Sequence, residues 1–376
     1  MAPFAIIILI ALIFFVAIPG VGAFTVRSRW RRFRRRLNEA SLLPLLEYGQ
    51  MRRLHHKSAG SNEFRFFGAL EAIQGDTALW LRGQDVTVAA DMARSDIYVL
   101  PQYTGALPDE PPVRTTWERL GSVTEGTKVF VCGEADADGV HATMHGTQTK
   151  PLLVILYDGP TRDLLRRCIW SGRQLNEYWN PLTPGALAGG MLALITVAFV
   201  LMQGPSGRLP ALVALALASI PLVPLLPPGV VLFLLYRNSW RHGRTLRAHR
   251  DILLLPLRHL HDTGGPGTLP DGRSYSLHYV SPEEIRKLPP EALLLRPPLA
   301  IASDHYAVFG HQSGDALVAP PDPMTEMIVI PGDPEELSGR CQRQARRYEL
   351  VSGAILGLGL LVNLFGALVL LQYLVR

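Results

Sequence analysis

Long apolar blocks alternate with polar stretches along the chain. Four blocks carry no charged side chain, and each is long enough to cross roughly 30 Å of hydrocarbon as a helix. They cover residues 5–24, 185–202, 209–235 and 350–374. The pattern predicts an α+β integral membrane protein with four transmembrane helices.

The heaviest basic clusters flank these blocks on one side, which is the cytoplasmic side by the positive-inside bias. We therefore expect both termini outside a bacterial inner membrane and both polar regions, 40–180 and 250–345, in the cytoplasm. No Lys or Arg precedes the first block, which favours an uncleaved anchor over a signal peptide. The clusters are Arg27, Arg29, Arg31, Arg32, Arg34, Arg35 and Arg36, then Arg237, Arg241, Arg244, Arg247 and Arg250, then Arg340, Arg343, Arg346 and Arg347.

Two features inside the blocks concern how the helices are built and packed. The third block contains five prolines, so it is either a bent span or two short re-entrant pieces, and its flanking charges favour a full crossing. Two G-x-x-x-G pairs place small residues on one helix face, where two spans can approach closely. The pairs are Gly185 with Gly189 and Gly353 with Gly357, and they predict packing of the second span on the fourth.

Short alternating segments follow the first Arg cluster and predict a β-rich domain over residues 60–180. Strands are expected at 64–73, 78–81, 86–90, 129–135, 140–144 and 151–157, separated by Gly and Asp turns such as Asp138-Gly139. Their number and length suit a small curled sheet or barrel of the oligonucleotide-binding (OB) type. An amphipathic helix at 161–178 then leads to the second span.

The second polar region, 251–345, predicts a small mixed α/β domain. Residues 275–280 and 327–330 read as strands, and each is followed by a helix start. Ser281-Pro-Glu-Glu and Asp333-Pro-Glu-Glu combine a capping residue, an initial proline and a Glu three residues on. After the second of these no Gly or Pro stop occurs before Gly353, so one helix is expected to continue into the fourth span.

Three motifs in the first polar region carry a family resemblance. Gly68-Ala-Leu-Glu71, Trp117-Glu118 and the run from Gly126 to Ala135 resemble the GIDE-type domain of the MULAN-like membrane protein family, over about residues 60–180. The resemblance implies a β-rich domain between two membrane helices. Some members carry a C-terminal RING finger with ubiquitin-ligase activity. This chain has no C-x-x-C pair, so that activity is not implied.

The composition of the chain and the distribution of its charges indicate which classes of binding partner to expect. The chain is 48% hydrophobic and 18% charged with a net charge of +5, and its arginines lie beside apolar blocks. This distribution does not predict nucleic-acid binding. The cluster Arg27–Arg36 is instead expected to contact anionic lipid headgroups. The three cysteines, Cys132, Cys168 and Cys341, fall in the cytoplasmic regions and are expected to be free thiols.

The sequence contains no phosphate-binding loop, serine-hydrolase elbow or zinc-protease motif. One weak metal candidate remains: His259, His261 and Asp262 could present two imidazoles and a carboxylate from one extended face. Other groups, such as His141 with His145 or Glu134 with Asp136 and Asp138, are explained as surface residues of a hairpin. No cofactor is predicted.

Two functional hypotheses follow. The first is a non-catalytic membrane scaffold or assembly protein that presents two cytoplasmic modules to other membrane or cytoplasmic proteins. The alternative is a membrane-bound metal-dependent hydrolase that uses His259, His261 and Asp262. The absence of catalytic motifs favours the scaffold.

Overall fold

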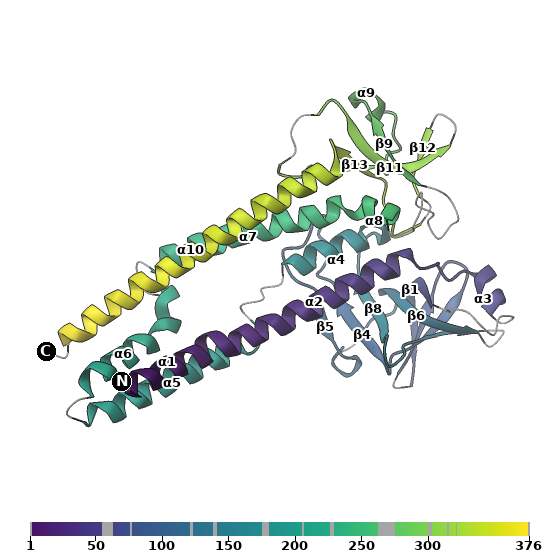
Figure 1. The fold of residues 1–376 in the computed structure, drawn as a ribbon. Helices are drawn as coiled ribbons and strands as arrows, with labels where there is room; N and C mark the ends of the chain where they lie inside the picture. The colour runs from purple at the N-terminus through teal and green to yellow at the C-terminus, as the bar shows by residue number, and fades with distance from the viewer. Residues whose placement is uncertain are drawn as a thin grey trace. The chain divides into compact units, whose positions relative to one another are not determined.

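The chain forms two compact units, each assembled from separate stretches (Figure 1). The helical unit contains residues 1–33, 176–246 and 343–376, and the mixed unit contains residues 34–175 and 247–342. The computed structural model describes residues 2–54, 63–75, 77–120, 123–137, 141–174, 180–204, 207–225, 229–261, 275–299, 303–313, 316–320 and 322–374.

The N-terminal helix of the helical unit pairs with the second apolar block. Phe14 and Phe15 lie against Gly190, where an added Cβ would come within 2.6 Å of each aromatic side chain. Asn180 donates from Nδ2 to the carbonyl of Pro19 at 3.1 Å. Phe14 lies beside Gly190, whereas the later residue Pro19 lies beside the earlier residue Asn180, so the two helices run antiparallel. The elements are α1 (Ala2–Leu12), a π-helical turn η1 (Ile13–Ala17), α2 (Ile18–Leu42) and α5 (Thr183–Met202).

The predicted third span, 209–235, is not one helix. It forms α6 (Arg208–Ala218), a 3-10 turn η4 (Ile220–Leu225) and the start of α7 (Gly229–Leu253). Prolines at 221 and 224 lack the backbone N–H that would continue α6, which explains the break. Ala211, Ala214 and Ala218 of α6 are buried with Leu194 of α5, so α6 folds back on α5.

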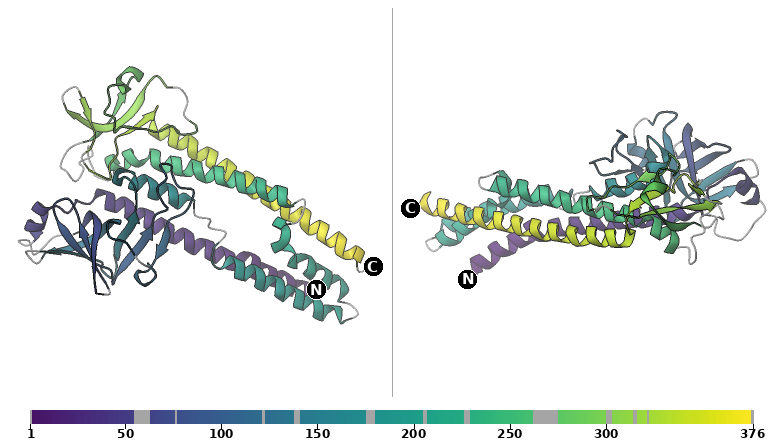
Figure 2. Two further views of the ribbon diagram at one scale, coloured as in Figure 1. Left: turned by 180° about the vertical axis from the view of Figure 1, so that it is seen from behind. Right: turned by 90° about the horizontal axis from the view of Figure 1, so that it is seen from above.

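The second half of the helical unit is an antiparallel pair formed by α7 and α10 (Pro334–Leu374). A Cβ at Gly359 of α10 would lie 3.3 Å from Leu232 of α7, and a Cβ at Gly243 of α7 would lie 3.4 Å from the Ala345 carbonyl. Ser239 donates to the Tyr348 carbonyl at 3.3 Å. As predicted, α10 is continuous from its capped start through the fourth apolar block. Figure 2 shows α7 and α10 side by side in both further views.

Three helical stretches among the described residues are long and apolar enough to cross a membrane: 2–42, 183–202 and 334–369. The fold is therefore a mixed α+β structure with three candidate spans and a β-rich domain. The expected packing of the second span on the fourth through G-x-x-x-G pairs is wrong. Gly189 faces Phe14 of η1, and Gly353 and Gly357 have no described neighbour within 4 Å of an added Cβ.

Five strands of the mixed unit close into a ring in the order β1–β2–β3–β7–β6–β1. All the pairings are antiparallel except that of β3 with β7. Alternate side chains fill the interior, among them Phe66, Leu81, Val88, Val131 and Met144. The strands are β1 (Glu63–Gln74), β2 (Ala78–Arg82), β3 (Thr87–Asp91), β6 (Lys128–Ala137) and β7 (Ala142–His145).

Three further strands extend this sheet from β6 in the order β8–β4–β5. Every residue of β8 is buried, and Leu152, Val154 and Leu156 belong to the same apolar core as the ring interior. The sequence predicted β8 and the α4 helix but missed β4 and β5. The elements are β4 (Ser95–Val99), β5 (Val113–Thr115), β8 (Leu152–Tyr157) and α4 (Leu164–Arg173), with short 3-10 turns η2 (Trp117–Arg119) and η3 (Thr161–Asp163).

A second, five-stranded sheet is built around β11, which pairs with β9, β12 and β13. Both predicted helix starts are present. Ser281 forms a reciprocal capping box with Glu284, and Asp333 accepts from the Glu336 N–H at 2.8 Å. The remaining elements are α3 (Tyr48–Leu54), α8 (Leu255–His261), β9 (Ser276–Val280), α9 (Pro282–Ile285), β10 (Leu293–Leu294), β11 (Tyr306–Ser313), β12 (Ala316–Val318) and β13 (Ile328–Pro331).

The two polar regions, expected as separate modules, belong to one compact unit. Arg65 of β1 pairs with Asp322 at 2.8 Å, and both side chains are almost completely buried. Such a pair needs support from further hydrogen bonds to offset desolvation. Arg65 donates from Nε to the Leu43 carbonyl at 2.6 Å.

Candidate functional site

The mixed unit carries an open groove of about 500 Å³ on the outside of the strand ring. Its floor is a row of side chains across three strands, because Ala69 of β1 is in register with Lys128 of β6, and Lys128 with Tyr157 of β8. The volume lies in the range of small-ligand sites. The lining residues are Leu45, Leu46, Glu47, Phe66, Phe67, Gly68, Ala69, Arg82, Gly83, Gln84, Asp85, Val86, Lys128, Tyr157, Thr161 and Pro323.

Two glycines hold the Phe66 ring at the inner side of this groove. A Cβ at Gly68 would lie 2.8 Å from the Phe66 ring, and a Cβ at Gly83 would lie 2.7 Å from it. Real Cβ atoms are not found this close to another carbon, so a larger residue at either position would displace the ring. The glycines therefore let β1 and the β2–β3 turn close tightly over Phe66.

Four of the polar side chains that line the groove have partners in the structure. Lys128 donates from Nζ to the Gly159 carbonyl at 2.7 Å, and Arg82 pairs with Glu71. The hydroxyls of Tyr157 and Thr161 are 3.1 Å apart. Burial raises the pKa of Tyr157, so this phenol is neutral and serves as a hydrogen-bonding group. A lining that combines apolar side chains with a few engaged polar groups suits binding.

The sequence candidates for a metal site fall at the end of α8. The main chain of residues 255–261 is helical, which corrects the extended geometry on which the prediction depended. The side chains of His259 and His261, and the whole of Asp262, lie outside the described residues. Within the part of the chain that the structure describes, no three His, Cys, Asp or Glu side chains form a group that could hold a metal.

The other sequence candidates lie on β6 and β7. His145 is 3.9 Å from Glu134 and 3.6 Å from Asp136, and all three are partly or largely exposed. The ring of His141 meets that of Trp80 edge-on. Asp138 and the predicted hairpin turn lie outside the described residues. Burial raises the pKa of Cys132 and of Cys168 to about 12, so neither thiol is an activated nucleophile.

Sequence reasoning missed a buried charge cluster around Asp251, whose side chain is completely inaccessible. Arg34 of α2 contacts it at 2.8 Å, Arg173 of α4 donates to it from Nε at 2.8 Å, and Arg250 of α7 donates from Nε at 3.0 Å. Burial alone would raise the pKa of Asp251, but the three guanidinium groups lower it. The only local signal was one acidic residue between a basic run and an apolar run.

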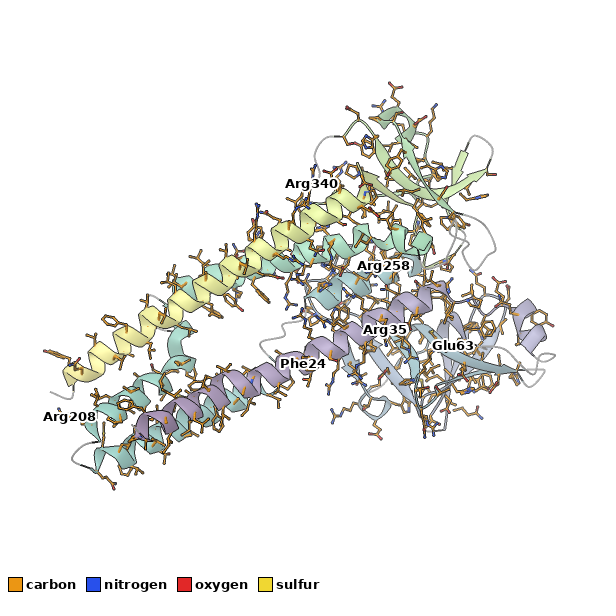
Figure 3. The ribbon with its side chains drawn as sticks, in the orientation of Figure 1. Phe24, Arg35, Glu63, Arg208, Arg258 and Arg340 are labelled. Atoms are coloured by element: carbon orange, nitrogen blue, oxygen red, sulfur yellow. The ribbon has the colours of Figure 1, made fainter. Side chains whose placement is uncertain are left out.

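Comparisons with known proteins give no match: no family model fits the chain, and no curated protein or solved structure is significantly similar to it. The site is therefore defined by its geometry alone. Figure 3 shows the side chains of both units, with Glu63 labelled at the start of β1 and Arg35 on α2.

Proposed function

We propose that the protein is a non-catalytic integral membrane scaffold that presents the groove of the mixed unit to a protein partner at the bacterial inner membrane. The groove carries this proposal, because it is an open surface of about 500 Å³ that combines apolar side chains with hydrogen-bonding groups. Its lining offers apolar area and hydrogen-bonding groups without a nucleophile next to a base, which is what a catalytic site requires.

The membrane assignment is supported by large apolar side chains on the helix surfaces. Phe24 is 72% exposed, Phe199 66% and Phe365 70%, and patches of this kind need an apolar environment. We propose a four-span topology in which α6 and the apolar start of α7 together make the third crossing. The eleven residues of α6 and about eight of α7 add up to roughly 28 Å of helix, close to the hydrocarbon thickness. Both termini would then lie outside and the mixed unit in the cytoplasm.

The exposed face of α2 supports anionic lipid headgroups as a further partner. Arg27, Arg29, Arg31 and Arg32 are exposed, and no ion pair involving them occurs among the described residues. The opposite face buries Trp30, Phe33 and Leu37. Each basic side chain near an anionic membrane surface contributes about 1 kcal/mol to the free energy of binding.

We also propose that the strand ring is an OB-like barrel of the GIDE type. Its order of five strands, with one parallel pair between the third and the last, is that of a small Greek-key barrel. Two of the three motifs behind the resemblance lie on neighbouring strands of this ring, and the third lies in η2. Gly68 of β1 pairs with Val129 of β6, and Trp117 packs against the ring core.

Site-specific photo-crosslinking in native membranes tests the scaffold proposal. A photoreactive residue in place of Phe67, in the groove, should capture a discrete protein. The same residue in place of Val113, which is 62% exposed on β5 and outside the groove, should not. Equal capture at both positions would contradict a specific role for the groove. Stoichiometric zinc or iron in the purified protein, lost from the variant with His259, His261 and Asp262 changed to Ala, would favour the hydrolase alternative instead.

A further inference from the structure

Two acidic side chains in the mixed unit share one arginine. Arg166 of α4 lies 2.9 Å from Asp163 through Nη2 and 3.5 Å from Glu326 through Nε. The Glu326 side chain is 8% exposed and the other two are 15% exposed. One guanidinium can neutralise only one carboxylate, so the second acidic group either carries a proton or remains a poorly compensated buried charge.

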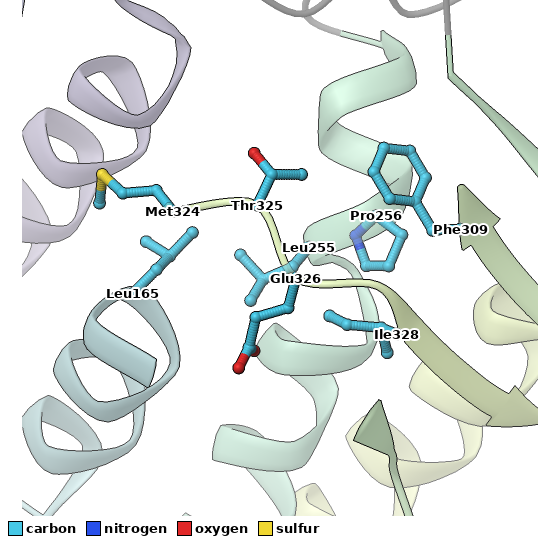
Figure 4. Close-up of a pocket in the computed structure, with 8 residues that line it drawn as sticks. All are labelled: Leu165, Leu255, Pro256, Phe309, Met324, Thr325, Glu326 and Ile328. Carbon is cyan, nitrogen blue, oxygen red and sulfur yellow. The ribbon is translucent and has the colours of Figure 1, made fainter. Parts of the chain in front are cut away.

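The surroundings of Glu326 are mainly apolar. It borders a small cavity of about 10 Å³, which is close to the volume that one water molecule needs. In Figure 4, Glu326 lies between Leu165 of α4 and Ile328 of β13, with Leu255 and Pro256 beside it. Phe309 of β11 closes another side of the same cavity. Among the described residues that line it, Glu326 is the single ionisable one.

The charged groups that act on Glu326 come from η3 and α4. Burial raises the pKa of Glu326 to about 7, with Asp163 raising it further and Arg166 and Arg162 opposing the shift. The described cavity-lining residues of α8, β11 and β13 are the apolar Leu255, Pro256, Phe309 and Ile328. Glu326 therefore changes its charge near neutral pH.

Glu326 belongs to a segment, residues 322–328, that joins the two parts of the mixed unit. Its other anchor is Asp322, which pairs with Arg65 of β1 at 2.8 Å. Asp322 also accepts from the Thr325 hydroxyl at 2.7 Å and from the Met324 N–H at 3.1 Å, which fixes the turn between the anchors. Beyond Ile328 the chain continues through β13 into α10.

We propose that residues 322–328 form a proton-dependent latch, closed over α4 when Glu326 is protonated and loosened when Glu326 is ionised. On deprotonation the proton passes to solvent water. The carboxylates of Asp163 and Glu326 then share the guanidinium of Arg166 in a largely apolar site, with Arg162 as a further basic group that acts on Glu326. Opening the segment lets water solvate the Glu326 carboxylate. This inference does not depend on the identity of the groove's partner.

Hydrogen exchange on the full-length protein in detergent or nanodiscs tests the latch. A group whose folded pKa is raised from 4.5 to about 7 favours the closed state at low pH. Opening becomes about twentyfold more frequent between about pH 5.5 and about pH 7.5 if it fully exposes Glu326. Protection factors of residues 322–330, corrected for intrinsic exchange, should fall accordingly, whereas those of β8 should not.

Glu326→Gln keeps a neutral side chain at every pH, so its protection in this segment should be independent of pH. Asp322→Asn is the matched control, since it weakens the other anchor and should lower protection while the pH dependence remains. Asp163→Asn should shift the midpoint to lower pH. An unchanged pH dependence in Glu326→Gln, or a flat profile in the wild-type protein, would overturn the proposal. Infrared titration provides an independent readout, because a protonated carboxyl band that disappears near pH 7 must be absent from the Glu326→Gln spectrum.

Discussion

Arg173 and Asp251, from helices α4 and α7, form a buried ion pair in which the guanidinium Nε donates to the carboxylate at 2.8 Å. Arg34 of α2 contacts the same carboxylate oxygen at 2.8 Å. Arg250, which also binds Asp251, lies 3.5 Å from Gln342 of α10. The mixed unit consists of two stretches of chain, and residues at or near all four of their ends therefore meet in one polar cluster.

Replacing the central carboxylate should strongly destabilise the mixed unit. Asp251→Ala leaves three buried or half-buried guanidinium groups without their shared partner, and breaking a buried pair in this way costs about 3–5 kcal/mol. Thermal unfolding of the detergent-purified protein measures the loss. Glu39→Gln is the matched control, because Glu39 and Arg35 form an exposed pair at 3.6 Å, whose removal should cost less than about 1 kcal/mol. Equal melting temperatures for the two variants would contradict this role.

The same cluster predicts how stability responds to acid. The arginines lower the pKa of Asp251 below its usual value of 3.8, against the opposing effect of burial. A depressed carboxylate pKa adds stability that is fully present above the unfolded value and is lost as pH falls through the folded value. The contribution of Asp251 should thus persist at about pH 5 and disappear only well below about pH 4. Comparing acid unfolding of wild type with Asp251→Asn measures it, and a difference that vanishes already at pH 5 would contradict the prediction.

The glycine at position 83 should resist substitution. In Gly83→Ala the new Cβ would lie 2.7 Å from the Phe66 ring and 3.1 Å from the Val86 carbonyl. Overpacking of this kind costs about 1–3 kcal/mol. Gly49→Ala, where an added Cβ meets no described atom within 4 Å, should not destabilise the protein. A second change, Phe66→Leu, should partly rescue Gly83→Ala in the same unfolding assay, and absence of rescue would show that the ring is not the obstacle.

Gly190 should tolerate substitution less well than Gly357. The sequence pattern predicted a packing role for Gly357 instead. Gly190→Leu should loosen the α1–α5 pair, because its side chain would displace Phe14 and Phe15. Gly357→Leu should be tolerated, since an added Cβ there has no described neighbour within 4 Å. Cysteine crosslinking between η1 and α5 in membranes compares the variants. If crosslinking fell in Gly357→Leu but not in Gly190→Leu, the result would contradict this prediction and favour the packing of the second span on the fourth.

The four-span topology is tested with reporter fusions. A reporter active only outside the inner membrane should be on when fused after Arg376 and off when inserted within residues 264–267, because hydrophobic length and basic flanks agree on these sides. The reverse pair of results would contradict the topology. A fusion after Gln203, between α5 and α6, should be on if α6 begins the third crossing.

The sequence predicted local elements well, because their causes are local. The strands β1, β2 and β6 follow apolar patterning between turns, and β8 follows a continuous apolar run. The helix starts at Ser281 and Asp333 follow from side chains that cap their own backbone. The length of the apolar blocks was enough to predict the first, second and fourth spans, each of which is one long apolar helical stretch in the structure. The short strands β4 and β5 were missed because their five and three residues carry little periodicity.

Apolar and polar patterning thus determined the helices and the strand-rich region. The sequence also lacks the familiar catalytic motifs. Only the tertiary structure decided that the third apolar block breaks into α6 and α7, that the two polar regions form one unit, and that a groove lies beside Phe67. It also decided which charges are buried. Asp251 and Glu326 look like ordinary acidic residues in the sequence, since their environments are created by arginines distant in the chain: Arg34 and Arg173 for one, Arg166 for the other. Burial and long-range pairing, which no local pattern encodes, set the properties of these carboxyl groups.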